Sequence, residues 1–136
     1  GNKMKICGIE LKSNNAIVSI IQSDTIDYID LKIKKISLDD DEKKESMISF
    51  KDNINEFLAQ NNIDKVAIKK RAKKGNFAGG AITFKMEAII QLNAVCDVTL
   101  VTSQAIAKYT KNNDVEFPNM LNKYQEQSYL SALLLV

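Results

Sequence analysis

The sequence contains no histidine, one proline and two cysteines among its 136 residues. Without histidine the chain can form neither a Ser-His-Asp triad nor a Cys-His dyad, and it cannot offer histidine ligands to zinc or iron. The available chemistry rests on carboxylates, lysine, cysteine and hydroxyl groups. Cys7 and Cys96 lie far apart, in apolar contexts and outside any Cys-x-x-Cys pair, so we expect reduced core thiols in a cytoplasmic protein.

The composition is that of a globular chain. Apolar residues make up 45% and charged residues 26% of the sequence, and no apolar run approaches the roughly 20 residues that a membrane helix needs. We therefore expect no membrane segment, no signal peptide, and one domain over residues 1–136. The net charge of +2 is too small for a general nucleic-acid binder, so an electrostatic argument depends on how charges cluster.

The densest charge cluster follows a short apolar segment, residues 66–68. Five of the six residues from Lys69 to Lys74 are cationic, and two glycines then precede a helical pattern. In open α/β proteins such a junction, at the carboxyl end of a strand, is where ligands bind. The predicted anion-binding or nucleic-acid-binding residues are Lys69, Lys70, Arg71, Lys73, Lys74, Phe77, Gly79 and Gly80. The alternatives are a solvated loop for the charges and a closely packed helix start for the glycines.

The first part of the chain alternates in the manner of β-strands. Residues 4–11 form a mostly apolar run typical of a central strand. Ala16, Val18 and Ile20 then alternate with their neighbours, and apolar residues alternate cleanly with polar ones over 29–33. We therefore predict three consecutive antiparallel strands.

The remainder alternates between helix and strand. Helical spacing runs from Met47 to the Asn61-Asn62 pair, and another helical pattern behind Gly80 reaches Leu92 and Asn93. Strands are predicted over 65–68 and 98–101, with a short helix capped by Thr102 or Ser103 after the second. Pro118 fits the first position of a helix, and a final helix is predicted within 120–136. This order predicts a ribonuclease H-like α/β fold with a five-stranded mixed sheet, order 3-2-1-4-5, and helices on both faces.

Three segments carry a family resemblance. Residues 4–16 look like the first hairpin of the RuvC-type Holliday-junction resolvases and their YqgF relatives, where a strand ending in Gly-Ile-Asp precedes a short turn; this chain has Gly8-Ile9-Glu10. Residues 66–68 fall where that group places its second strand-end acid, and residues 96–101 with the following helix also match. Residues 74–80 and 84–87 look characteristic of an uncharacterised bacterial family of RuvC-like proteins. The resemblance spans nearly the whole chain.

The resemblance implies a site for two Mg²⁺ or Mn²⁺ ions about 4 Å apart, which needs several carboxylates. Glu10 occupies the first position and Glu126, in the final helix, a later one; these two are the implied catalytic residues, and Asp97 joins them as an implied metal ligand. The second acid position falls on Lys69 or Lys70, where an ammonium repels a metal ion. Glu10 has a structural interpretation as well, as an ion-pair partner of one of these lysines. The final helix offers Gln125 and Ser128 in the remaining positions.

Three functions remain open. The first, which we favour, is a module without robust catalysis that binds DNA, RNA or another polyanion through the basic loop, with Phe77 stacking on a base. The second is a Mg²⁺- or Mn²⁺-dependent endonuclease that uses Glu10 and Glu126. The third is a scaffold whose edge strand over 29–33 pairs with another protein or with a second copy to form a homodimer.

Overall fold

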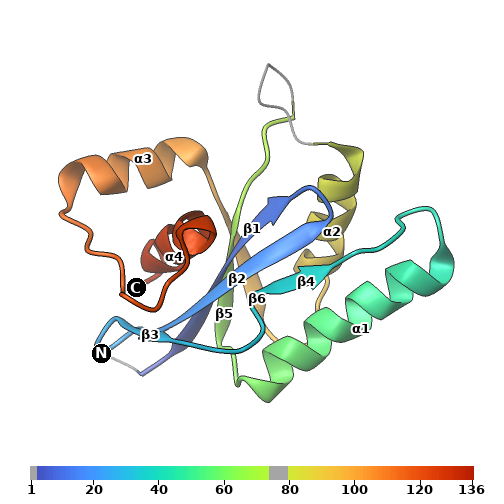
Figure 1. Ribbon diagram of the computed structural model, residues 1–136, viewed down its shortest axis with the longest axis horizontal. Helices are drawn as coiled ribbons and strands as arrows, with labels where there is room; N and C mark the ends of the chain where they lie inside the picture. The colour runs from blue at the N-terminus through green and yellow to red at the C-terminus, as the bar shows by residue number, and fades with distance from the viewer. Residues whose placement is uncertain (1–2, 74–79) are drawn as a thin grey trace.

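The computed structural model describes residues 3–73 and 80–136, which are built around a mixed β-sheet (Figure 1). The strands are β1 (Lys5–Lys12), β2 (Asn15–Gln22), β3 (Asp27–Ile29), β4 (Lys35–Ser37), β5 (Lys65–Lys69) and β6 (Asp97–Val101). The helices are α1 (Lys44–Gln60), α2 (Ala81–Gln91), α3 (Ser103–Asn112) and α4 (Glu126–Leu133), with a 3-10 turn, η1 (Lys123–Gln125), before α4.

The strand order β3-β2-β1-β5-β6 confirms the predicted order, because β5 and β6 are the fourth and fifth strands of the prediction. β1 pairs antiparallel with β2 and parallel with β5, and β6 extends the parallel part. The parallel pairing therefore ends at one level, at Glu10, Lys69 and Val101.

Alternation along β1 directs side chains into two cores on opposite faces of the sheet. Cys7, Ile9 and Leu11 are buried with apolar residues of α1 and α2. Ile6 is buried on the other face with residues of α3 and α4. Figure 1 shows the two helix pairs on the two sides of the sheet. Gly8 lies on the α4 side, and α4 packs so closely there that a β-carbon on Gly8 would overlap the carbonyl oxygen of Ser128.

The predicted third strand, residues 29–33, is wrong in its extent. Two short strands, β3 and β4, pair with β2 in its place, and the sheet gains a sixth strand over the described residues. The segment between them lies outside both strands, and Lys34 Nζ there contacts the Leu31 carbonyl and lies 3.3 Å from Asp30 Oδ1. The Lys34 carbonyl still accepts a hydrogen bond from Val18 N of β2 at 3.0 Å. Pairing of this edge with a second copy stays a prediction.

Two predicted helix boundaries are also wrong. Pro118 begins no helix; its carbonyl accepts a turn hydrogen bond from Leu121 N, and the final helix starts after Asn122, which forms a capping box with Gln125. The helix behind Gly80 ends at Gln91, leaving Leu92 84% exposed. Asn93 ends it by donating from Nδ2 to the Ile90 carbonyl at 2.7 Å.

Candidate functional site

The carboxyl ends of β1 and β5 place two opposite charges side by side. Glu10 and Lys69 are register partners, and Lys69 Nζ lies 3.8 Å from Glu10 Oε2. Their side chains are only 13% and 19% exposed. This confirms the ion-pair interpretation of Glu10 and identifies Lys69 as the partner, whereas Lys70 is exposed.

Gln127 is a third member of this site that the sequence analysis missed. Lys69 Nζ donates a hydrogen bond to Gln127 Oε1 at 2.9 Å, which links β5 to the first turn of α4. The ammonium therefore has a carboxylate and an amide oxygen as partners. A divalent cation wants several oxygen ligands and no neighbouring positive charge, so the Glu10–Lys69 pair does not fit such an ion.

The acids of the implied metal set are not brought together. Asp97, at the start of β6, is the register partner of Lys65, whereas Glu10 is the register partner of Lys69. Asp97 therefore lies four residues back along the parallel strands from the level of Glu10, or about 13 Å at 3.3 Å per residue. Glu126 is half-buried at the start of α4, and its pairing with Glu10 stays a prediction. Within residues 3–73 and 80–136, no three or more acidic, cysteine or histidine side chains are grouped in a way that could hold a metal ion.

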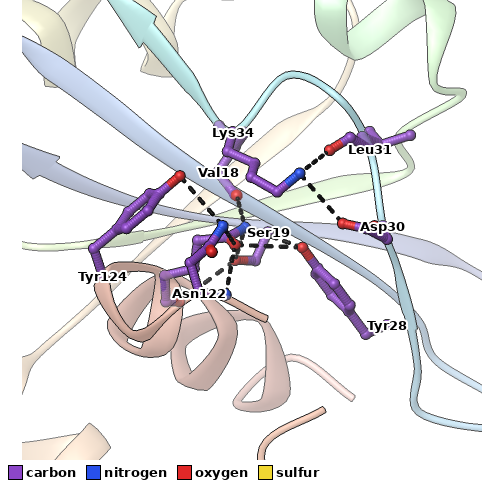
Figure 2. Close-up of polar contacts among 9 residues, drawn as sticks. Val18, Ser19, Tyr28, Asp30, Leu31, Lys34, Asn122 and Tyr124 are labelled. Atoms are coloured by element: carbon purple, nitrogen blue, oxygen red, sulfur yellow. Dashed lines mark hydrogen bonds and ion pairs between the residues drawn. The ribbon is translucent and has the colours of Figure 1, made fainter. Parts of the chain in front are cut away.

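The other predicted final-helix positions, Gln125 and Ser128, form a buried polar network with β2. Figure 2 shows Val18, Ser19, Tyr28 and Asn122, which surround this network. Gln125 Nε2 donates to the Val18 carbonyl at 3.0 Å and lies 3.1 Å from the Tyr28 hydroxyl. Ser128 Oγ lies 2.6 Å from Ser19 Oγ. These uncharged groups anchor the helix to the sheet, because each buried polar atom gains a partner that it would otherwise lack.

A cleft of about 320 Å³ opens next to the strand end that carries Lys69, between the end of β5 and the start of α3. We call it the basic cleft; its lining residues are Lys70, Arg71, Ala72, Lys73, Thr102, Ser103 and Gln104. Three lining residues are cationic and none is acidic. Arg71 Nε is buried and has no hydrogen-bond partner among the described residues. Thr102 caps α3 by accepting a hydrogen bond from Ala105 N at 3.0 Å, as predicted for one of the two capping candidates.

The structure places Gly80 as the N-cap of α2. Among the described residues, a β-carbon there would meet no atom within 4 Å, so close packing against them does not explain this glycine. Its carbonyl accepts hydrogen bonds from Thr83 N and Thr83 Oγ1. Lys74, Phe77 and Gly79, the other predicted members of the anion-binding surface, lie outside the described residues.

Both cysteines are free thiols. Burial is the main cause that raises the pKa of the Cys96 thiol from 9.0 to about 11, and burial also raises the pKa of Cys7 well above its usual range. The thiolate is the reactive form, and we expect it to make up only about one part in 10⁴ of Cys96 at pH 7, about 100-fold less than at the ordinary pKa of 9.0. Its iodoacetamide labelling rate, followed by mass spectrometry, should rise about tenfold per pH unit above pH 7.

The sign of the linked stability effect follows from the same pKa. The Cys96 thiol holds its proton more tightly in the folded state than in the unfolded state. Its contribution to the free energy of unfolding is therefore fully present below pH 9.0 and is lost as the pH rises towards about 11. Labelling of the folded protein that is as fast at pH 7 as in 6 M urea would contradict the shifted pKa of Cys96.

Solved structures similar to this chain share its fold at low sequence identity. The structure of RuvC from Thermus thermophilus has a TM-score of 0.71 and 9% identity, over 96% of this chain and 92% of that one. The T. thermophilus RuvC complex with a Holliday junction substrate gives 0.65 and 12%, over 96% and 90%. The yeast mitochondrial Holliday junction resolvase Ydc2 gives 0.57 and 12%, over 96% and 75%. The predicted ribonuclease H-like fold is thereby confirmed.

The sequence comparisons place the chain in a family. No curated protein sequence matches it. Among the described residues, no helix is both long and apolar enough to cross a bilayer. A family model does match, over residues 4–135, and its description is "Protein of unknown function (DUF3010)". The chain, which has the fold of the RuvC resolvases, therefore belongs to the DUF3010 family.

Proposed function

We propose that this protein binds the phosphate backbone of a nucleic acid at the basic cleft, without metal-dependent cleavage. The observation that carries the proposal is the position of Lys69. Its ammonium neutralises Glu10 at the strand ends, while the next cations along the chain line an open cleft at the same edge. A positive cleft beside a neutralised acid favours an anion over a cation.

The cations of the cleft are available to a ligand. Lys70, Arg71 and Lys73 have no ion-pair partner within the described part of the chain. The buried Arg71 Nε lacks an acceptor, and an unpartnered buried donor costs about 1–3 kcal/mol. A phosphate oxygen is an acceptor of the right charge, and arginine binds phosphate with more than one N–H group.

The fold relatives agree with a nucleic-acid ligand. One of them is a RuvC structure in complex with a Holliday junction. In our proposal the present chain keeps a nucleic-acid surface of this kind and has lost the acidic centre. Lys74 and Phe77 extend the surface on sequence grounds, the first as a further phosphate contact and the second by stacking on a base.

Fluorescence anisotropy with labelled single-stranded, duplex and four-way DNA and single-stranded RNA, over a salt series, tests the proposal. Three phosphate contacts give a slope of log affinity against log salt of about −2 on a single strand. Replacing Lys70, Arg71 and Lys73 together by alanine is expected to remove this part of the slope, leaving only what Lys74 contributes, and to weaken binding about 10- to 100-fold at low salt.

The matched control removes the same charge elsewhere. Lys32, Lys44 and Lys108 are exposed and lie outside the cleft, so their joint replacement by alanine should leave binding within about threefold. Equal losses in the two triple variants would reduce the effect to net charge and overturn the proposal. Mn²⁺-dependent cleavage of the same DNA that is lost in Glu10→Gln would overturn the absence of catalysis.

A further inference from the structure

A second groove, of about 500 Å³, lies at the other end of the sheet from the basic cleft. We call it the acidic groove; its lining residues are Ile26, Asp27, Tyr28, Asp30, Glu116, Phe117, Pro118, Asn119, Met120 and Tyr129. β3 pairs with the end of β2, which in turn pairs with the start of β1. The groove and the Glu10–Lys69 pair therefore lie at opposite ends of β1. Residues of β3 and of the segment that follows α3 line the groove, and both elements can be found in Figure 1.

The floor of the acidic groove is aromatic. Tyr129 packs edge to face against Tyr28, with ring centroids 6.3 Å apart, and against Phe117 at 5.9 Å. Two aliphatic side chains are held open to solvent beside these rings, Met120 at 64% exposure and Ile26 at 44%. Exposed apolar side chains next to aromatic rings offer hydrophobic contacts to a partner.

The rim of the groove carries one sign of charge. Three lining residues are acidic and none is cationic. Asp30 is paired with Lys34, but neither Asp27 nor Glu116 has an ion-pair partner within the described part of the chain. Carboxylates beside aromatic rings suit a lysine or arginine side chain, which gains both an ion pair and a cation–π contact. A phosphate backbone would be repelled.

Ile26 adds a backbone observation. Its φ of 54° lies in the left-handed region, which a β-branched residue occupies only at a cost of about 1–3 kcal/mol. Residues held in such conformations cluster at binding sites. Here the strained conformation carries a large apolar side chain that stays exposed at the groove, and not one that fills the core.

We propose that the acidic groove binds a segment of a partner protein in which a lysine or arginine is flanked by apolar side chains. The apolar flanks cover Met120 and the exposed part of Phe117, and the cation lies between Asp27 and Glu116. The charge of the rim argues against an acidic segment, and the apolar floor argues against a purely basic one. This surface is separate from the basic cleft, so it acts independently of nucleic-acid binding.

Selection from a phage-displayed library of random heptapeptides on the full chain tests the proposal. Peptides that combine lysine or arginine with leucine, isoleucine or phenylalanine should be enriched. A synthetic copy of the most enriched peptide should lose at least about tenfold in affinity, measured by anisotropy, on the double variant Met120→Ser with Glu116→Lys. Both positions are exposed, so the variant should fold.

The matched control is Leu92→Ser with Glu42→Lys, which makes the same two changes at exposed positions outside the groove. It should bind the peptide within about twofold of the wild type. Enrichment of acidic peptides, no enrichment, or equal binding by the groove variant and the control would each overturn the proposal. So would wild-type self-association, seen by sedimentation and absent from the groove variant, because the occupant would then be a second copy.

Discussion

Alanine in place of Gly8 is expected to lower the free energy of unfolding by about 3 kcal/mol or more. The new β-carbon would overlap the Ser128 carbonyl oxygen and lie 2.8 Å from the Ala132 amide nitrogen. Both are backbone atoms of α4, so no side chain can rotate away, and the helix must move off β1. Overpacking of this kind costs more than the typical 1–3 kcal/mol when the backbone has to shift. Urea unfolding followed by circular dichroism measures the change.

Gly80→Ala is the matched control for this effect. Gly80 has a φ of −71°, and its added β-carbon would meet no atom of residues 3–73 and 80–136 within 4 Å. The loss of a glycine N-cap should cost less than about 1 kcal/mol. A Gly8→Ala variant as stable as Gly80→Ala would mean that α4 does not pack on β1 as described.

Replacing Lys69 by glutamate is expected to raise the affinity of the strand ends for Mn²⁺ above that of the wild type. The new carboxylate would lie next to Glu10 on a neighbouring strand, about 4.8 Å away in backbone spacing. Without metal the two carboxylates repel each other at a largely buried site, so the variant should be destabilised. In 5 mM Mn²⁺ its Tm should rise by about 5 °C or more, because an ion that binds the folded state alone stabilises it.

Lys70→Glu makes the same charge change one residue further along, at an exposed position. Its Tm should shift by less than about 1 °C in Mn²⁺. An equal Mn²⁺ response from Lys69→Glu, Lys70→Glu and wild type would show that the ammonium of Lys69 is not what keeps a cation out.

Much of the fold could be predicted because local patterns suffice for it. Strands β1, β2, β5 and β6 follow from apolar runs and alternation, and α1 follows from helical spacing that stops at two asparagines. The wrong boundaries lie where local side-chain contacts, which a hydrophobic pattern does not reveal, accompany the ends of a strand or helix. Residues 30–33 lie outside both short strands, where Lys34 Nζ contacts the Leu31 carbonyl, and the capping box at Asn122 starts the final helical segment later than Pro118 would.

The candidate site could be predicted only in part. Strand ends in a parallel pair must meet, so Glu10 and Lys69 could be brought together from the sequence. Gln127 could not, because its contact with Lys69 depends on the rotation of α4 over the sheet. The closeness of Gly8 to Ser128 depends on the same docking. The acidic groove likewise joins β3 to residues 116–120, which no spacing rule connects.

The docking of α4 has a consequence for how the chain acquires its structure during synthesis. Ser19 forms its hydrogen bond with Ser128, 109 positions further along the chain. Gly8 packs against the same distant helix, α4. Until residues 126–133 leave the ribosome, one side of the nascent sheet has a bare apolar surface with unpaired hydroxyls. Contacts of such long range slow folding and leave intermediates prone to aggregate. A ribosome stalled before α4 should therefore carry a chain that chaperones bind and proteases cut.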